Sequence, residues 1–177
     1  MNNNLLTTFP SAAFNFPRPL YSIRFEMSYN KIKNLSSSAF AFLPPTSSVS
    51  ITLNFNQITT VQTSTFKINA SSAIEIHLSN NSIATVAPNA FNFSTSQTGY
   101  SYLNLAGNVM TKVLPGTFSF SSCYSATLQL ADNVIKSISS RAFNFMSVSN
   151  VQLCLENNQI SFIESSAFQG NRVALDN

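Results

Sequence analysis

The strongest constraint on this chain is a sequence pattern that recurs every 25 to 27 residues. In the copy at residues 151–168 it reads hydrophobic-x-Leu-x-Leu-x-x-Asn-x-Ile-x-x-Ile and then, after a short spacer, Ala-Phe. The Asn of the pattern occurs seven times, at Asn4, Asn30, Asn56, Asn81, Asn108, Asn133 and Asn158. Self-similarity at such a period is typical of a solenoid, in which each repeat forms one turn of a coil.

Each repeat begins with an alternation of apolar and polar residues. When the Asn is numbered as position nine, positions four, six, eleven and fourteen are apolar; in one repeat they are Leu103, Leu105, Met110 and Val113. Position two is usually apolar as well. Because side chains alternate between the faces of a strand, positions two, four and six predict a half-buried strand in every repeat.

A phenylalanine column follows at position nineteen. Its members are Phe14, Phe40, Phe66, Phe91, Phe118, Phe143 and Phe168. A small residue, Ala or Thr, precedes most of them, and we expect the rings to stack behind the strands as a spine, since an aromatic side chain buries about 150–250 Å². The intervening Ser- and Asn-rich segments are expected to form turns or short helical segments.

These features resemble the leucine-rich repeat family, in the extracellular-like class whose repeats read LxLxxNxIxxIxxxAF. The resemblance covers essentially the whole chain. It implies a β-solenoid horseshoe with a short-stranded parallel sheet on the concave face and the Phe spine on the convex side. It also implies a single array over residues 1–177, with about seven repeats of 25–27 residues. One departure concerns position one, where the family has a Leu and this chain has polar or other residues such as Ser22 and Tyr100.

The two ends of the chain interrupt repeats. Met1 falls at position six of a repeat, and residues 173–175 begin another strand. A solenoid needs a polar or cross-linked cap over its last hydrophobic layer. We therefore expect this chain to be a fragment of a longer array that lacks both caps.

The repeated Asn residues have a structural explanation. A buried backbone group without a hydrogen-bond partner is costly, and a side-chain amide offers both donors and an acceptor. Stacked amides can therefore bond neighbouring turns where the strand ends. This structural ladder is expected at Asn30, Asn56, Asn81, Asn108, Asn133 and Asn158.

Composition argues against several functional classes. Charged residues make up 8% of the chain and its net charge is +3, with Lys and Arg scattered, so we expect no nucleic-acid partner. No window of 18 consecutive apolar residues occurs, so no membrane segment is expected within the chain. The start lacks the pattern of a signal peptide.

Catalytic and metal chemistry find no support in the sequence. His77 is the only histidine, the six acidic residues are widely spread, and no nucleophile motif selects a serine. Cys123 and Cys154 are expected to remain unbridged, because Cys123 is several residues out of register and a disulfide tolerates Cα atoms only about 7 Å apart. We expect no catalytic residues, no metal site, no cofactor and no enzyme activity.

Three sequons are candidate N-glycosylation sites, at Asn34, Asn69 and Asn92. All three are expected on the turn or convex side, where a glycan leaves the concave sheet open. That distribution suits a secreted protein. A fourth sequon, at Asn80, lies beside the ladder and is the least suited to modification.

The candidate ligand-binding residues are the polar residues of the strand face opposite the core. They are Arg24, Glu26, Thr52, Asn54, Glu75, His77, Tyr102, Asn104, Gln129, Gln152 and Glu156. With strands about 4.8 Å apart, this face would be roughly 25–30 Å wide, which suffices for an interface of about 800 Å² per partner. Tyr102, with His77 and Asn104, is the expected centre, because Tyr is favoured at binding hot spots.

The resemblance then carries most of the functional prediction. The chain is expected to be a non-enzymatic recognition or adhesion module, secreted or on the cell surface, that binds a protein or glycan ligand through the concave face. One alternative is a cytoplasmic leucine-rich repeat scaffold or regulator, for which unbridged cysteines and unused sequons would be expected. Another is a structural surface-coat array without a specific ligand.

Overall fold

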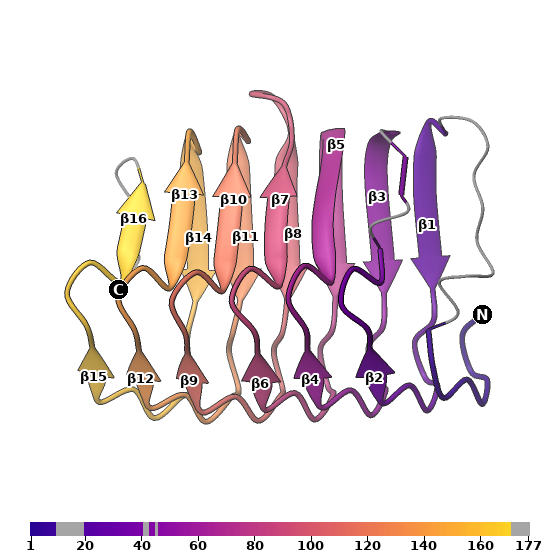
Figure 1. Cartoon of the computed structure of the whole chain (residues 1–177), viewed down its shortest axis with the longest axis horizontal. Coiled ribbons are helices and arrows are strands. Elements are labelled where there is room, and N and C mark those ends of the chain that lie inside the picture. Colours follow the sequence, from indigo (N-terminus) through magenta and orange to yellow (C-terminus); the bar gives the residue numbers. More distant parts are fainter. Residues whose placement is uncertain (10–19, 41–42, 45, 171–177) are drawn as a thin grey trace.

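The computed structural model of the chain describes residues 1–9, 20–40, 43–44 and 46–170. They form a parallel β-solenoid of about six turns (Figure 1). No helix occurs in these described ranges, so the expected short helical segments are wrong, and strands stand in their place. Phe14 and the strand expected at 173–175 lie outside the described residues. The leucine-rich repeat assignment itself stays a prediction.

The predicted strands form one long parallel sheet, here called the front sheet. Its strands are, in order, β1 (Ser22–Glu26), β3 (Thr46–Thr52), β5 (Phe66–His77), β8 (Tyr100–Asn104), β11 (Ser125–Gln129) and β14 (Asn150–Cys154). Equivalent repeat positions pair directly, as Leu103 does with Leu128. Apolar residues such as Ile74 and Ile76 are fully buried, while the residues between them face outward.

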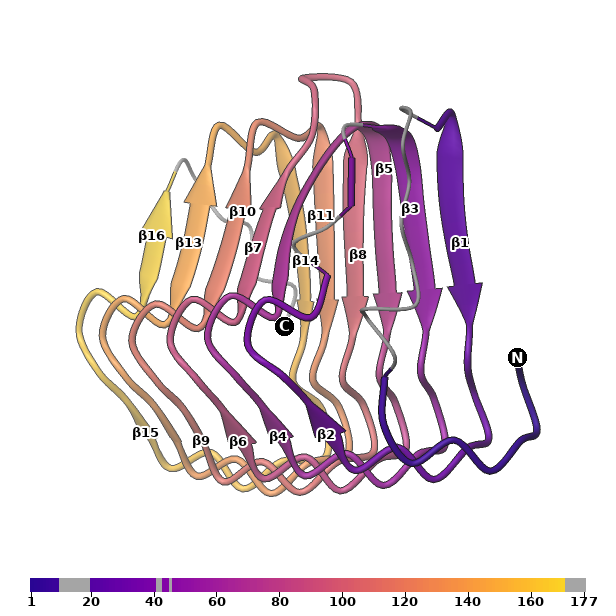
Figure 2. The ribbon, with the colours of Figure 1, turned by 45° about the vertical axis from the view of Figure 1, so that its right-hand side comes forward.

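A second parallel sheet, the back sheet, contains the Phe column. It joins the first half of β5 to β7 (Phe91–Ser94), β10 (Phe118–Ser121), β13 (Phe143–Met146) and β16 (Phe168–Gly170). The alternation Phe-x-Phe in β7 and β10 buries both rings and leaves the residue between them half-buried on the opposite face, as expected for a strand. β5 runs through both sheets without a break, so they form one ten-stranded sheet (Figure 2).

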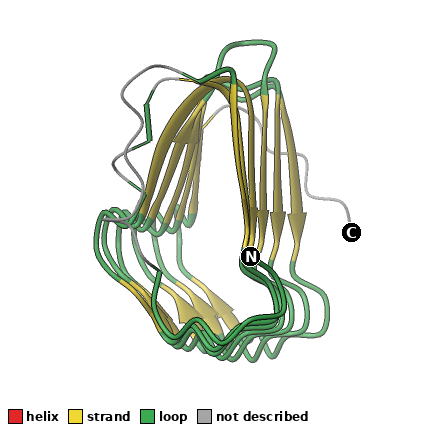
Figure 3. Cartoon of the chain, turned by 90° about the vertical axis from the view of Figure 1, so that its right-hand side faces the viewer, coloured by secondary structure: helices red, strands yellow, loops and turns green. Residues whose placement is uncertain are grey.

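Short strands form the third side of the coil. β2 (Asn34–Leu35), β4 (Thr60–Val61) and β6 (Thr85–Val86) pair in one group, and β9 (Lys112–Val113), β12 (Ser137–Ile138) and β15 (Phe162–Ile163) pair in the other. Viewed along the coil, the two longer sheets lean together at one end and the short strands close the opposite side (Figure 3). The space enclosed by the three sides holds the hydrophobic core.

The Phe column is a continuous stack inside the coil. Its ring centroids are 4.9 Å apart between Phe40 and Phe66, 5.1 Å between Phe66 and Phe91, and 5.6 Å between Phe91 and Phe118. These four rings are completely buried. A second column meets the first edge-on, with 6.1 Å between the centroids of Phe91 and Phe93. Offset stacking and edge-to-face contact at these distances are the favourable arrangements of aromatic rings.

The repeated Asn side chains join each turn to the one before it. The Asn81 amide oxygen accepts from the backbone N–H of Ile58 at 3.1 Å. Its amide nitrogen donates to the carbonyl of Leu53 in the preceding turn and to that of Leu78 in its own, both at 3.0 Å. Asn56, Asn108 and Asn133 make the same set of bonds. The backbone groups left over where each front strand ends are thereby satisfied.

The residue before each ladder Asn turns the chain with a positive φ. Asn80 and Asp132 have φ of 54°, and Gly107 has φ of 66°. At Gly107 a Cβ would come within 2.8 Å of the Asn80 side-chain oxygen. Glycine suits this position because the Asn80 side chain lies close and the backbone is left-handed, although other turns place Asn80 and Asp132 at the equivalent position.

Candidate functional site

A hollow lies at the centre of the front sheet. Its volume is about 380 Å³, in the lower part of the range of roughly 300–1,000 Å³ found for small-ligand sites. Three neighbouring strands, β5, β8 and β11, supply its walls. The lining residues are Glu75, His77, Tyr100, Ser101, Tyr102, Ser125 and Thr127.

Strand alternation and register bring these side chains together. Glu75 and His77 are two residues apart on β5 and alternate with the fully buried Ile74, Ile76 and Leu78, so both face outward. In the pairing of β5 with β8, Glu75 lies directly opposite Tyr102. Directly opposite residues of one face have Cβ atoms about 4.5–5.5 Å apart. The site is therefore built on paired strands and not on loops.

Three contacts hold the polar and aromatic groups of the hollow in place. The Tyr100 hydroxyl donates a hydrogen bond to the Glu75 carboxylate. This bond, together with burial, raises the pKa of Tyr100, so the phenol stays protonated and remains a donor. The His77 and Tyr102 rings are 5.1 Å apart between centroids and tilted by 40°. Asn104 donates from its side-chain amide to the Tyr102 hydroxyl at 3.4 Å.

Tyr100 reaches the hollow through a tight turn at Gly99. The loop at 95–99 projects beyond the ends of the sheets between β7 and β8 (Figure 1). A Cβ on Gly99 would lie 2.6 Å from the Ser72 carbonyl oxygen and 2.7 Å from the Thr95 hydroxyl. Only glycine fits this close approach. This close approach fixes where the loop joins β8. Tyr100, the first residue of β8, therefore lies beside Glu75.

Burial in the hollow changes the protonation of His77. Desolvation lowers the pKa of the imidazole below 6.5; the Glu75 carboxylate acts in the opposite direction, and Arg24 adds to the lowering. Burial disfavours the charged form of a base. The ring is accordingly neutral at pH 7.

The His77 titration gives a direct test of this environment. We expect its imidazole NMR resonances to titrate with a midpoint below 6.5. The pKa of His77 is lower in the folded chain than in the unfolded chain, so the unfolded chain binds more protons between the two pKa values. The stability that His77 contributes is therefore present above about pH 6.5 and is lost as pH falls through the folded pKa. Tyr102→Ala uncovers the ring and should move the midpoint upward. A wild-type midpoint at or above 6.5 would contradict the buried, neutral histidine. With one histidine in the chain, the signals need no further assignment.

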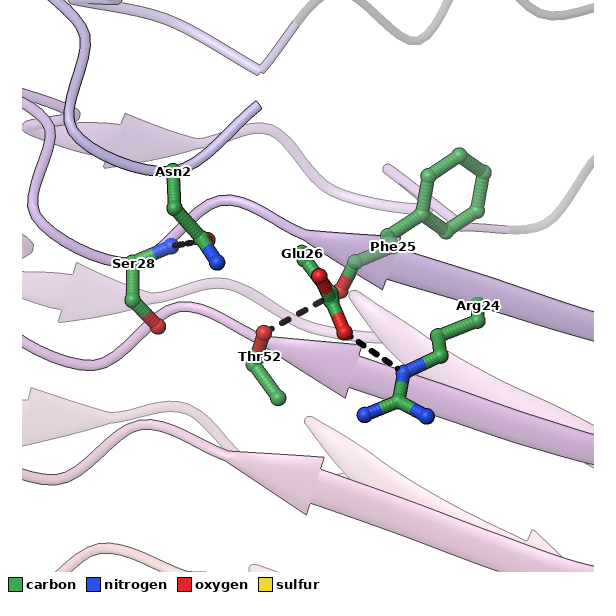
Figure 4. A network of polar contacts seen from close by, with 6 residues as sticks. All are labelled: Asn2, Arg24, Phe25, Glu26, Ser28 and Thr52. Carbon is green, nitrogen blue, oxygen red and sulfur yellow. Dashed lines mark hydrogen bonds and ion pairs between the residues drawn. The ribbon is translucent and has the colours of Figure 1, made fainter.

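The remaining predicted binding residues lie on the front sheet but outside the hollow. Arg24 and Glu26 form an ion pair on β1, with 2.7 Å between Nε and Oε1 (Figure 4). Thr52 of β3 donates to the Phe25 carbonyl at 3.3 Å in the same view. Asn54 accepts from both the backbone and the hydroxyl of Ser79 at 2.9 Å. Each of these side chains has a polar partner outside the hollow, and none of them lines it.

Three predicted residues lie toward the β14 edge. Gln129 is half-buried at the end of β11, and Gln152 and Glu156 are exposed on and after β14. None of them lines the central hollow. Cys154 lies opposite Gln129, whereas Cys123 precedes β11 and is buried, so the two cysteines form no disulfide, as expected. Burial raises the pKa of the Cys123 thiol.

Glu75, His77 and Tyr102 were predicted to share one face. Four further lining residues were not among the predicted binding residues: Tyr100, Ser101, Ser125 and Thr127. Tyr100 stands at position one, which the family resemblance assigns to a core leucine. Here it is exposed, because position two has taken the inward place in the strand. The usable signal was the spacing: Tyr100 and Tyr102 are two residues apart and so share a face.

The three sequons lie away from the front face. Asn34 is exposed on β2 and Asn69 is exposed on the back-sheet half of β5, where it pairs with Ser94. Asn92 is half-buried on β7. None of these three side chains lines the hollow.

The described residues contain neither a cluster of metal-ligating side chains nor a membrane-spanning helix. No group of three or more His, Cys, Asp and Glu residues in the described ranges is placed to hold a metal ion. No helix in this part of the chain is long and apolar enough to cross a membrane. No protein-family model matches the chain, and neither a curated protein nor a solved structure matches it.

Proposed function

We propose that the chain is a non-enzymatic recognition module of the leucine-rich repeat kind, secreted or on the cell surface. It binds a protein or glycan ligand through the outer face of the front sheet. The observation that carries the proposal is the central hollow, where aromatic rings, a carboxylate and hydroxyl groups converge on three adjacent strands. A mostly apolar depression with a few convergent polar groups is the usual form of a binding site.

The rest of the solenoid supports this assignment by contrast. The core positions repeat from turn to turn, with Phe91, Phe118 and Phe143 fully buried. The outward positions change instead, from Arg24 and Glu26 on β1 to Glu75 and His77 on β5. A regular core that presents an irregular face is the architecture of repeat-protein binding surfaces.

The double substitution Tyr102→Ala and His77→Ala tests the proposal. Screening the chain against arrays of glycans and of extracellular protein domains identifies the ligand, and surface plasmon resonance then compares affinities. We expect the double variant to raise Kd by about tenfold or more, as the loss of two central contacts does at hot spots. Tyr124→Ala is the matched control, because Tyr124 is also exposed but lies outside the hollow. Unchanged affinity in the double variant would count against this surface.

A cytoplasmic scaffold built from the same repeats is the second candidate function. In that case Cys123 and Cys154 would stay reduced in the cell, whereas secreted proteins commonly bridge their cysteines. Mass spectrometry of the protein from its native source distinguishes the two. Glycans on Asn34, Asn69 or Asn92 would exclude the scaffold, and unmodified sequons with reduced cysteines would favour it.

A further inference from the structure

One carboxylate and three aromatic rings share the central hollow. Glu75 is opposite Tyr102 and accepts a hydrogen bond from Tyr100, so it is flanked by tyrosines on β8. The imidazole of His77 packs against the ring of Tyr102. The rings and the carboxylate all line the same depression of about 380 Å³. This arrangement has no counterpart among the hydrogen-bonded groups of β1 and β3.

The electrostatic balance of the hollow is negative. Glu75 is the single carboxylate among the lining residues, and no ion pair involves it in the described part of the chain. The guanidinium of Arg24 is already neutralised by an ion pair with Glu26, with 2.7 Å between Nε and Oε1. His77 adds no positive charge at neutral pH. An anionic ligand would meet an uncompensated carboxylate here, whereas a cation would be attracted by it.

The faces of the aromatic rings also favour a cationic ligand. The ring of Tyr carries negative charge on its face, and a ligand cation within about 6 Å of the ring centre is attracted to it. Aromatic side chains around an ammonium group are a recurrent recognition device for quaternary and methylated amines. Ser125 and Thr127 complete the wall with hydroxyl groups that can accept hydrogen bonds from N–H donors.

We propose that the hollow lined by Glu75, Tyr100, Tyr102 and His77 binds the ammonium group of a lysine side chain, free or methylated, on a protein ligand. This inference rests on the proposed function and specifies the ligand chemistry at its centre. Glu75 provides the charge, the rings of Tyr102 and His77 provide the cation-binding faces, and the Tyr100 hydrogen bond orients the carboxylate. A lysine is long enough to enter a shallow depression while its backbone stays at the sheet surface.

The experiment compares three small probes by NMR titration of the whole chain. They are Nα-acetyl-lysine methylamide, its Nε-trimethyl form, and a neutral analogue in which carbon replaces the quaternary nitrogen. We expect the trimethyl cation to bind at least about fivefold more tightly than the neutral analogue, since a cation over exposed or partly buried rings gains a few-fold to about thirtyfold. Its chemical-shift changes should map to Tyr102 and His77. Higher salt should weaken binding of the cations but not of the neutral probe.

Two matched variants locate the charge that matters. Glu75→Gln keeps the shape and a hydrogen-bond acceptor but removes the charge, and should weaken cation binding about five- to tenfold. Glu164→Gln removes a carboxylate that follows β15 on the third side of the coil, outside the hollow, and should leave binding unchanged. Preserved folding is checked by the dispersion of the same spectra. Equal losses in both variants would overturn the assignment of Glu75.

The remaining outcomes separate this inference from the proposed function. A neutral probe that binds as tightly as the cation overturns the cation site. Binding of methyl glycosides at the hollow, with no binding of the cations, also overturns it and leaves recognition through the front sheet standing with a glycan ligand. If a partner found in the array screen is unaffected by the Tyr102→Ala and His77→Ala double variant, the front-sheet proposal itself fails.

Discussion

Replacing Phe91 by Ala should lower the free energy of unfolding by about 3–5 kcal/mol, the range for buried Phe-to-Ala changes. Phe91 is completely buried in the middle of the stack, with centroids 5.1 Å from Phe66 and 5.6 Å from Phe118. Truncation removes its buried area and leaves a cavity between two turns. Those turns are held in place by the parallel strands β5, β7 and β10, so they collapse only in part.

Urea denaturation followed by circular dichroism measures this loss. Phe162→Ala is the control, because Phe162 is 59% exposed on β15 and its removal opens no cavity. We expect that variant to lose under about 1 kcal/mol, as surface substitutions usually do. Similar losses in the two variants would mean that the stack does not carry the stability assigned to it.

The second large effect is expected for Asn81→Ala, which should lower the free energy of unfolding by about 2–4 kcal/mol. The substitution leaves the buried N–H of Ile58 without its partner. The carbonyls of Leu53 and Leu78 each lose one bond and keep only their bond to Asn56 or Asn108. A buried backbone group stranded in this way costs about 1–3 kcal/mol. The loss falls on both turns that Asn81 joins, because its bonds cross from one to the other.

Thermal melts of Asn81→Ala and Asn150→Ala provide the comparison. Asn150 is exposed at the start of β14, so its truncation should leave the melting temperature nearly unchanged. Asn81→Asp is informative as well: it keeps an acceptor for Ile58 but loses the two donors and buries a charge. It should therefore not restore stability. A melting temperature for Asn81→Ala equal to that of Asn150→Ala would refute the structural role of the ladder.

The candidate site was predictable in part, and the reasons differ between its residues. Glu75, His77 and Tyr102 were placed on one face because alternation along a strand depends only on local backbone geometry. The link from Tyr100 to Glu75 was not accessible in that way. It depends on the register of β5 with β8 and on the turn at Gly99, where Ser72 and Thr95 of other segments leave no room for a side chain.

The strands of the back sheet were not predicted, for a different reason. Residues 91–94 and 118–121 alternate Phe with polar residues, which is a strand pattern in its own right. The Ser- and Asn-rich composition of these segments led to the prediction of turns or short helical segments, and the local alternation was not used. The structure follows the alternation: Phe93 and Phe120 fill the second column behind Phe91 and Phe118, an arrangement that a helical period would not give.

The sequence by itself determined the coil period, the inward and outward faces of each front strand, and the position of Asn and Phe in every turn, because these depend on repetition and on local periodicity. The tertiary structure alone decided that the coil has three strand-lined sides, that β5 runs through two sheets, and that Tyr100 meets Glu75. Those features arise from hydrogen bonds and side-chain contacts between turns about 25 residues apart, whose register depends on the length and packing of every connecting segment.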